Sequence, residues 1–572
     1  MPRPVRPLEL QDGDRSNITG SQQPRNGRTA IAVSTVRTVT FDLLRSLGLT
    51  RIFGNPGSTE ETFLKDFPAD FTYHLALQEA SAIAIADGYA QATGKPAIVN
   101  VHTAAGLGNA MGNLITASLN KTPLIVTAGQ QTREMLLMEP WLTNVEATML
   151  PRPWVKWAYE PVRPEDVPAA FMRAYAVATQ APAGPVFLSL PLDDWDKPCD
   201  GPAVVRTVSR RVAPDMDRLK EFADILSKAA SPVLIFGAAI DRGDGWADAV
   251  ALAERLGAPV WAAPASERVP FPENHPLYAG GLPFALGPLS ERLAGHDVAI
   301  VIGAPVFRYY PYVAGRYLPE GLRLLHISDD PAETARAPVG DSLVADAVLA
   351  TRALAERVTP RAKQGGSPAS PSRPVPASPA AAPAGEAGVP RAAAVFAALA
   401  EVRPDDAVLV HETPSNLADL RRAWPITRPR TFFTFASGGL GWNLPASVGI
   451  ALGERDTGRN RPVVMIIGDG SFQYSLQALW TAAQNDLRIV FIVMRNGQYG
   501  ILKSFAVLEE TPGVPGLDIP GIDIVSLARG YGCEAERITD LEELKRRVTA
   551  GLAGTRPCVF EVPITAEVPP LI

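Results

Sequence analysis

The sequence predicts an α/β protein of three domains, each built on a mainly parallel sheet. Its 572 residues are too many for a single hydrophobic core. Short apolar runs alternate with stretches of helical periodicity along most of the chain, which is typical of parallel sheets covered by helices. The clearest such unit lies between Arg461 and Phe505.

Residues 461–505 predict a strand, a glycine turn, a helix and a second strand. Residues 463–467 are wholly apolar and mostly β-branched, as in a strand buried on both faces. Gly468-Asp469-Gly470 then breaks the chain, and residues 489–494 form a second apolar run that ends before Asn496-Gly497. Between the two runs, apolar side chains recur at helical spacing at Phe472, Leu476, Leu479, Trp480 and Ala483.

Oxygen-bearing side chains follow both strands of this unit. Because ligands bind at the carboxyl ends of parallel strands, we expect Asp469 and Asn496 to lie together at that edge. With the backbone carbonyl of Gln498 they would form a shell of hard oxygen ligands, which suits Mg²⁺ or Ca²⁺ that is also bound by phosphates. Gly470 and Ser471 open the predicted helix, so their N–H groups face the same anion. A bare Gly-Asp-Gly would more simply be an ordinary turn with a capping serine.

Composition excludes several classes of partner. Hydrophobic residues make up 46% and charged residues 20% of the chain, as in ordinary globular proteins. The net charge of −6 gives no reason to expect nucleic acid or an anionic membrane as a partner. Cys199, Cys533 and Cys558 form neither a disulfide framework nor a zinc motif, so we expect a cytoplasmic protein. No apolar run of the sequence is long enough to span a bilayer.

Composition also divides the chain. Residues 1–30 are polar and predict a disordered tail, and residues 360–390 are rich in Pro, Ala, Ser and Gly and predict a linker. The three predicted domains are residues 31–195, 204–356 and 391–572. In the first two of them the predicted strands are residues 97–101, 124–128, 186–190, 233–237, 259–262, 298–302 and 324–327.

The order of Gly-Asp-Gly, helix, strand and Asn-Gly resembles the metal and diphosphate motif of thiamine diphosphate enzymes, with the Asn 27 residues after the Asp. In such enzymes the cofactor carries the chemistry, and a carboxylate hydrogen-bonded to its pyrimidine ring activates it. Glu79 follows an apolar strand and starts a predicted helix, so it is the candidate for that role. In isolation Glu79 would be an ordinary acidic residue at a helix N-terminus.

A wider set of motifs resembles the benzoylformate decarboxylase family. The motifs occur in all three predicted domains, so the resemblance covers almost everything from residue 31 except the linker. They are residues 52–58 (IFGNPGS), 75–88 (LALQEASAIAIADG), 102–112 (HTAAGLGNAMG), 123–133 (PLIVTAGQQTR), 151–161 (PRPWVKWAYEP), 303–309 (GAPVFRY), 438–441 (GGLG) and 514–532 (VPGLDIPGIDIVSLARGYG).

This resemblance implies a role for each matching residue. Glu79 would activate the cofactor across a subunit interface, Ser58 would bind the substrate carboxylate, and His102 would act as acid and base near the reacting carbon. Leu440 would support the bent cofactor. Further cofactor contacts would come from Gly438, Ser415, Gly470, Ser471, Asn496 and Tyr499. Without the resemblance, Ser58 would be a helix cap, His102 a buried strand-end residue and Leu440 a core residue. The resemblance also implies a homo-oligomer, at least a dimer and by expectation a tetramer.

The sequence departs from the family pattern near the expected substrate. Tyr310 stands where the family has a second histidine, and a phenol, with a pKa of about 10 against about 6.5 for imidazole, is the poorer proton donor at neutral pH. We therefore expect carboligation with a second aldehyde to take a larger share of turnover. The other predicted pocket residues are Ser58, Thr434, Phe435, Ile501 and Phe505. Ile501 replaces a smaller residue, so aromatic and short aliphatic 2-keto acids both stay open as substrates.

As a whole, the sequence predicts thiamine diphosphate- and metal-dependent decarboxylation of a 2-keto acid to an aldehyde, with acyloin-forming carboligation beside it. One alternative is another carboligase or lyase on the same framework, acetolactate-synthase-like or CoA-linked. The former usually carries FAD, and no GxGxxG motif follows a strand in the middle domain. A catalytically decayed regulatory homologue is disfavoured because Glu79, Asp469 and Asn496 are all retained.

Overall fold

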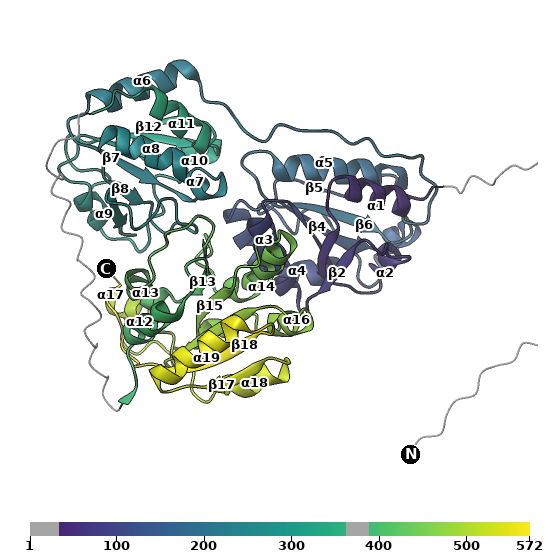
Figure 1. Cartoon of the computed structure of the whole chain (residues 1–572). Helices are drawn as coiled ribbons and strands as arrows, with labels where there is room; N and C mark the ends of the chain where they lie inside the picture. Colours follow the sequence, from purple (N-terminus) through teal and green to yellow (C-terminus); the bar gives the residue numbers. More distant parts are fainter. Residues whose placement is uncertain (1–33, 362–387, 572) are drawn as a thin grey trace, which may run out of the picture.

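The computed structural model describes residues 34–361 and 388–571, which form three six-stranded sheets (Figure 1). All neighbouring strands described in these sheets are parallel. The strands of the three sheets fall within residues 51–191, 232–344 and 408–563. The predicted three-part α/β fold is therefore confirmed. The predicted tail, residues 1–30, and nearly all of the predicted linker, residues 360–390, lie outside the described residues.

The first sheet has the strand order β2-β1-β3-β4-β6-β5. Its strands are β1 (Arg51–Asn55), β2 (Thr72–Leu75), β3 (Ala97–Val101), β4 (Leu124–Gln130), β5 (Ala158–Tyr159) and β6 (Val186–Pro191). Strands β3, β4 and β6 are buried along their whole length, which explains why the sequence shows them as largely apolar runs. The helices that matter for the site, α3 (Glu79–Thr93) and α4 (Thr103–Leu119), begin just beyond the ends of β2 and β3.

The middle sheet has the order β12-β11-β10-β7-β8-β9. Its strands are β7 (Pro232–Phe236), β8 (Val260–Ala262), β9 (Tyr278–Gly281), β10 (Val298–Ile302), β11 (Arg323–Ser328) and β12 (Asp341–Val344). The four predicted strands of this domain match β7, β8, β10 and β11 to within one residue. Its helices include α6 (Met216–Lys228), α7 (Ala238–Arg242), α8 (Trp246–Leu256), α9 (Leu286–Arg292), α10 (Pro331–Arg336) and α11 (Ala347–Arg357).

The third sheet has the order β14-β13-β15-β16-β18-β17. Its strands are β13 (Val408–Glu412), β14 (Phe432–Phe433), β15 (Val463–Gly468), β16 (Ile489–Arg495), β17 (Glu534–Arg537) and β18 (Cys558–Pro563). Its helices include α12 (Ala392–Val402), α13 (Leu417–Ala423), α14 (Asn443–Asp456), α17 (Gly500–Leu508), α18 (Ile524–Gly530) and α19 (Leu541–Ala553). Strands β15 and β16 are the two runs predicted from residues 461–505, side by side in the centre of the sheet.

The single helix predicted between β15 and β16 is wrong, because the structure breaks it into α15 (Asp469–Phe472) and α16 (Ala478–Gln484). The backbone N–H groups of Gln473 and Tyr474 bond three residues back, which ends α15 after one turn. The bend that follows brings Tyr474 against a glycine turn, where a Cβ on Gly441 would lie 2.6 Å from that of Tyr474. Packing against this turn, rather than helix periodicity, decides the local conformation.

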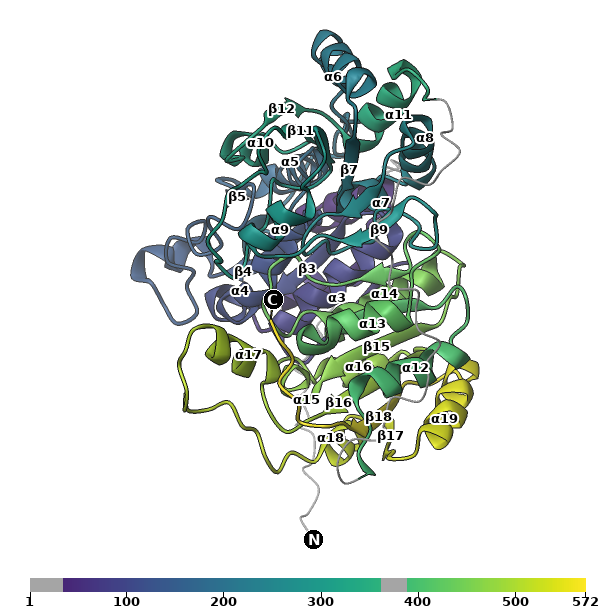
Figure 2. The same cartoon turned by 90° about the vertical axis from the view of Figure 1, so that its left-hand side faces the viewer.

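Helices α3 and α14 pack against each other and join the first and third domains of one chain (Figure 2). A Cβ on Gly88 would lie 2.1 Å from the carbonyl oxygen of Ala446, so the two backbones approach as closely as glycine allows. The indole nitrogen of Trp442 donates a hydrogen bond to Asp87 at 2.8 Å across the same contact. The sequence predicted a contact of these domains only between subunits, and the structure adds one within the chain. The contact is possible because α3 consists largely of small residues, most of which are buried.

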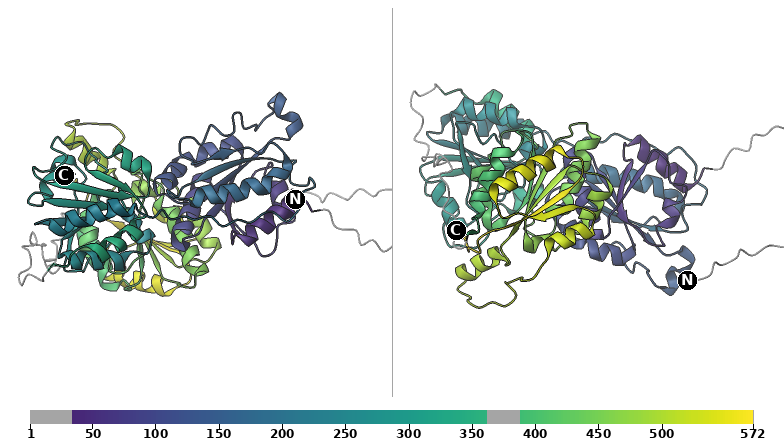
Figure 3. Two further views of the ribbon diagram at one scale, coloured as in Figure 1. Left: turned by 90° about the horizontal axis from the view of Figure 1, so that it is seen from above. Right: turned by 60° about the horizontal axis from the view of Figure 1, so that its bottom comes forward.

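The first domain lies on one side of the molecule and the middle domain on the other (Figure 3). Among the described residues, no helix has both the length and the apolar character needed to cross a membrane.

Candidate active site

A cavity lies in the third domain where β13, β15 and β16 end. It encloses about 450 Å³ of empty space, part of it open to solvent. Most of the residues predicted to bind cofactor and metal line it: Ser415, Leu440, Asp469, Gly470, Ser471, Asn496, Gln498 and Tyr499, together with the predicted pocket residue Ile501. The parallel topology places them together, because all of these loops leave the same edge of one sheet.

Two backbone hydrogen bonds fix the carboxylate of Asp469. Its Oδ1 accepts from the N–H of Gly470 at 3.0 Å, and its Oδ2 accepts from the N–H of Gly497 at 2.7 Å. The amide oxygen of Asn496 accepts from the N–H of Gln498 at 3.2 Å. Burial is the main cause that raises the pKa of Asp469. A buried carboxylate beside an amide oxygen is a donor set that suits a divalent cation.

The cavity wall also contains a buried hydroxyl group. The hydroxyl of Thr413 lines the wall, is buried, and has no hydrogen-bond partner among the described residues. Ser415 and Ser471 line the same cavity. Leu440 also lines it, from the glycine turn that precedes α14. Buried polar groups normally find partners, so an unbonded hydroxyl beside two serines fits a phosphate-bearing ligand.

Glu412 is a buried carboxyl group in the cavity wall that the sequence did not single out. Its Oε1 accepts from the N–H of Gly441 at 2.8 Å and its Oε2 from the N–H of Asn443 at 3.0 Å. These two bonds hold the turn that carries Leu440. Burial is the main cause that raises the pKa of Glu412 to about 7, against the opposing effect of the two backbone N–H groups.

Glu79 lies at the corresponding edge of the first sheet. It is 7% exposed, and each of its carboxylate oxygens accepts a hydrogen bond from one side-chain amide. Asn55, the last residue of β1, donates to Oε1 at 3.1 Å, and Asn109 of α4 donates to Oε2 at 3.1 Å. The carboxylate is thus oriented from two elements, β1 and α4.

His102 is bonded to a second carboxylate, Glu60, which the sequence did not predict. The Nδ1 atom of His102 lies 2.8 Å from Oε2 of Glu60 and 3.2 Å from the hydroxyl of Thr59. Glu60 also accepts the N–H of Gly129 at 2.7 Å, so it ties the loop after β1 to the end of β4. Ser58 lies exposed on this same loop. A Cβ on neighbouring Gly57 would lie 2.2 Å from Nδ1 of His102, so only glycine permits this approach.

The structure does not bring all predicted residues to one place in a single chain. Glu79, Ser58 and His102 do not line the cavity of their own third domain. Tyr310 and Phe505 form a pair of their own, with ring centroids 5.1 Å apart.

Three further predicted residues are not among those that line the cavity, so their assigned contacts stay predictions. Thr434 donates from its hydroxyl to the carbonyl oxygen of His411 at 3.1 Å. Phe435 packs on the buried cluster of Ala84, Trp442 and Ala446. Gly438 is exposed, with a φ of +76° that favours glycine.

The comparisons with known proteins agree with this arrangement. Three models of thiamine pyrophosphate enzymes match the chain: the N-terminal TPP binding domain over residues 34–147, the central domain over residues 219–354 and the C-terminal TPP binding domain over residues 415–562. The benzoylformate decarboxylase of Pseudomonas aeruginosa is 44% identical over 538 residues, which cover 93% of this chain and 99% of that protein.

Solved structures give the same result. The benzoylformate decarboxylase of Polynucleobacter necessarius superposes with a TM-score of 0.89 at 54% identity and covers 94% of this chain and 99% of its own. A putative thiamin diphosphate-dependent enzyme from Mycobacterium smegmatis superposes with a TM-score of 0.85 at 52% identity, over 93% of this chain and 99% of its own. The chain therefore belongs to the thiamine diphosphate-dependent 2-keto acid decarboxylases, in the family that includes benzoylformate decarboxylase.

Proposed function

We propose that this enzyme decarboxylates a benzoylformate-like aromatic 2-keto acid to an aldehyde and CO₂, using thiamine diphosphate and Mg²⁺ (or Ca²⁺). The observation that carries the proposal is the cavity of the third domain, where Asp469 and Asn496 meet Ser471 and Leu440. The printed names of two relatives, both benzoylformate decarboxylases, support the choice of substrate.

In this proposal the cavity holds the cofactor. Asp469, Asn496 and the carbonyl of Gln498 would bind the metal, and Ser415, Thr413 and the N–H group of Ser471 would receive the diphosphate. When bound, thiamine diphosphate supplies a sink for the electron pair released as CO₂ leaves. Leu440 would hold the cofactor in its bent shape, and the two backbone bonds to Glu412 keep the turn of Leu440 in place.

The first-domain residues would act on a cofactor bound in the third domain of another copy of the chain. Glu79 is oriented by Asn55 and Asn109 but does not line the cavity of its own chain. In the same domain, residues 135–150 expose large apolar side chains, with Leu137 95% and Trp141 93% exposed. Apolar surface of this size is rarely left to water, so we assign it to a partner copy in a dimer, with a tetramer as the expected final assembly.

Each remaining residue has a task in the reaction. Ser58 would bind the carboxylate of the substrate, so that the bond between this carboxylate and the keto carbon can break. His102 would move protons to and from the oxygen on that carbon. The carbon that loses CO₂ must gain one proton to become an aldehyde, and Tyr310 is the group proposed to supply or relay it. Where protonation is slow, a second aldehyde is captured instead, which is the proposed carboligase activity.

The decisive experiment is an assay of the purified full-length chain with added thiamine diphosphate and Mg²⁺. We expect CO₂ and benzaldehyde from benzoylformate, at higher kcat/KM than from pyruvate or branched 2-keto acids. Treatment with EDTA should abolish the activity, and Mg²⁺ or Ca²⁺ should restore it. Asp469→Asn should weaken thiamine diphosphate binding measured by calorimetry. No CO₂ release from any of these acids would contradict the proposal, and release only from pyruvate would correct the substrate class.

The subunit arrangement is tested separately. Light scattering should give the mass of a dimer or tetramer, and mixing inactive Glu79→Gln with inactive Asp469→Asn protein should restore part of the activity through mixed sites. The three cysteines are free and buried, which supports the proposed cytoplasmic location.

A further inference from the structure

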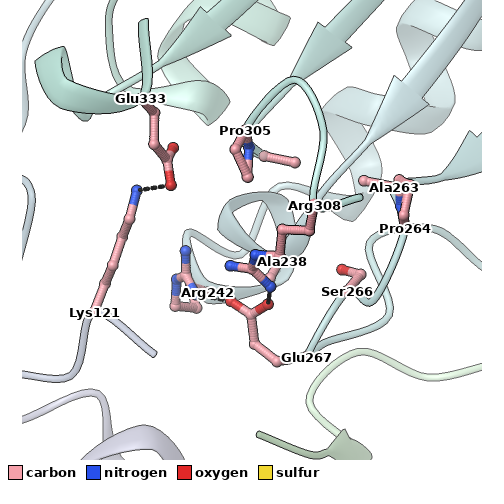
Figure 4. Close-up of a pocket in the computed structure, with 12 residues that line it drawn as sticks. Lys121, Ala238, Arg242, Ala263, Pro264, Ser266, Glu267, Pro305, Arg308 and Glu333 are labelled. Carbon is pink, nitrogen blue, oxygen red and sulfur yellow. Dashed lines mark hydrogen bonds and ion pairs between the residues drawn. The ribbon is translucent and has the colours of Figure 1, made fainter. Parts of the chain in front are cut away.

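Glu267 lies buried between two arginine side chains in the middle domain (Figure 4). Its Oε2 accepts from Nη1 of Arg308 at 2.8 Å, and its Oε1 accepts from Nη1 of Arg242 at 2.7 Å. The residue is 2% exposed. Burial alone would raise the pKa of Glu267, but the two arginines overcome this and lower it to about 2. The group is therefore a carboxylate with one oxygen for each arginine.

The position of Glu267 is fixed from all three domains. Its backbone carbonyl accepts the N–H of Thr434 from the third domain at 3.1 Å. Arg242, which binds its Oε1, also donates to the carbonyl oxygen of Asn120 in the first domain at 3.3 Å. Because Glu267 is anchored in this way, its Oε2 atom holds a fixed position for a hydrogen-bond donor.

That second oxygen binds Arg308, two residues before Tyr310. Arg308 donates a further bond to the carbonyl oxygen of Ala265 at 3.1 Å, so its guanidinium is held at two points of one loop. Among the described residues, the backbone of Tyr310 makes one hydrogen bond, from its N–H to the carbonyl oxygen of Phe284 at 3.0 Å. Its side chain is 68% exposed and rests on the ring of Phe505.

Phe505 connects this pair to the cavity. It lies one helical turn after Ile501 on α17, and residues four apart share a helix face. Because Ile501 lines the cavity, the Tyr310 ring stands one turn from the cavity wall. A shift of the Arg308 segment would therefore move Tyr310 relative to Phe505.

We propose that Glu267 is a positioning residue, which holds Arg308 so that Tyr310 stays against Phe505 and thereby sets the ratio of aldehyde to acyloin product. The inference rests on the proposed function, because it assigns Tyr310 to protonation. It adds a residue that does not line the cavity to the control of product choice.

The test compares Glu267→Gln with Tyr310→Phe and with the double variant. Glu267→Gln should shift the acyloin to aldehyde ratio in the same direction as Tyr310→Phe, by about twofold or more, as expected for residues coupled through a backbone shift. In the Tyr310→Phe background the same change should have no further effect on the ratio. Arg242→Gln is the comparison variant, because it removes the partner of Oε1 and leaves the bond to Arg308; it should shift the ratio less than Glu267→Gln does.

A merely structural role would lower thermal stability and total activity without this pattern. An unchanged ratio in Glu267→Gln, or an equal shift in the wild-type and Tyr310→Phe backgrounds, would overturn the inference. Should Glu267→Gln not fold, Arg308→Lys tests the same bond from a side chain that is 27% exposed. A crystal structure of either variant gives a readout free of substrate: we expect the 5.1 Å separation of the Tyr310 and Phe505 rings to be lost. If benzoylformate gives no aldehyde in the wild type, the proposed function fails, while this ring geometry still tests the positioning.

Discussion

The Nδ1 atom of His102 lies 2.8 Å from Oε2 of Glu60, a carboxyl group that is almost completely buried. A carboxylate at this distance accepts the Nδ1–H proton and leaves Nε2 as the nitrogen that can take up or release a proton. Glu60 is itself held by the N–H groups of Gly57 and Gly129. The orientation of His102 is thus set by the ends of β1 and β4.

We expect Glu60→Gln to lower kcat by about 100-fold, the lower range for loss of a positioned general acid or base. The amide can hold the imidazole in the wrong tautomer while leaving the substrate pocket in place, so KM should change much less than kcat. Steady-state kinetics with benzoylformate measure both constants. Glu61→Gln is the control, because Glu61 is the adjacent exposed carboxylate. Equal losses in the two variants would contradict the assigned role.

Tyr310→His tests the link between proton donation and product choice. Imidazole has an ordinary pKa of about 6.5, so it donates a proton at neutral pH more readily than a phenol with a pKa of about 10. The variant should therefore form more aldehyde and less acyloin than the wild type. Chromatography of the products from benzoylformate plus an added aldehyde measures the ratio. An unchanged ratio would show that another group protonates the carbon.

Ile501→Ala tests the size of the proposed substrate pocket. Ile501 lines the cavity, and its replacement by a methyl group makes room for a ring. We expect the kcat/KM ratio of benzoylformate to pyruvate to rise by about tenfold, since a methylene group in an apolar pocket changes selectivity by that order. Val507→Ala on the same helix is the control, because Val507 is 74% exposed. A fall in this ratio would mean that Ile501 holds the ring instead of excluding it.

The strands and the loops that carry Asp469 and Asn496 were predictable from sequence because buried parallel strands are short, apolar and followed by turns. Strands β15 and β16 appear in the sequence as unbroken apolar runs, and topology alone then brings Asp469 and Asn496 to one edge. The break between α15 and α16 was not predictable in this way. It depends on the approach of Tyr474 to the turn at Gly441, a contact between distant parts of the chain.

The residues that orient His102 and the turn of Leu440 were not predicted from the sequence. Glu60 follows Ser58 by two residues, yet nothing in its spacing distinguishes it from Glu61 beside it. Only the folded sheet brings the N–H of Gly129 to its carboxylate. Glu412 is the last residue of β13, which is buried along its whole length, so an acidic residue at the end of a buried strand is the sequence signal that points to it. The pairing of Tyr310 with Phe505 joins two domains and leaves no trace in either segment.

Glu412→Gln should change how stability depends on pH. In the folded protein burial raises the pKa of Glu412 to about 7, above the 4.5 of a free glutamate, so the folded state binds this proton more tightly than the unfolded state. The resulting stabilisation is complete below about pH 4.5 and is lost as the pH rises through about 7, by an amount on the order of 3 kcal/mol. The variant keeps a neutral side chain at every pH and should lose this dependence.

Thermal unfolding of cofactor-free protein between about pH 5 and pH 8 measures this effect. The unfolding temperature of the wild type should fall relative to that of Glu412→Gln as the pH rises. Only the wild type has a carboxyl group that must stay protonated, or become a buried charge, in the folded state. Glu454 offers the matched control. It is equally buried, but its bonds to Arg461 and Arg459 overcome burial and lower its pKa, so Glu454→Gln should be destabilised across this whole range. A constant difference between wild type and Glu412→Gln would show that the carboxyl group of Glu412 is ionised throughout, stabilised by the N–H groups of Gly441 and Asn443.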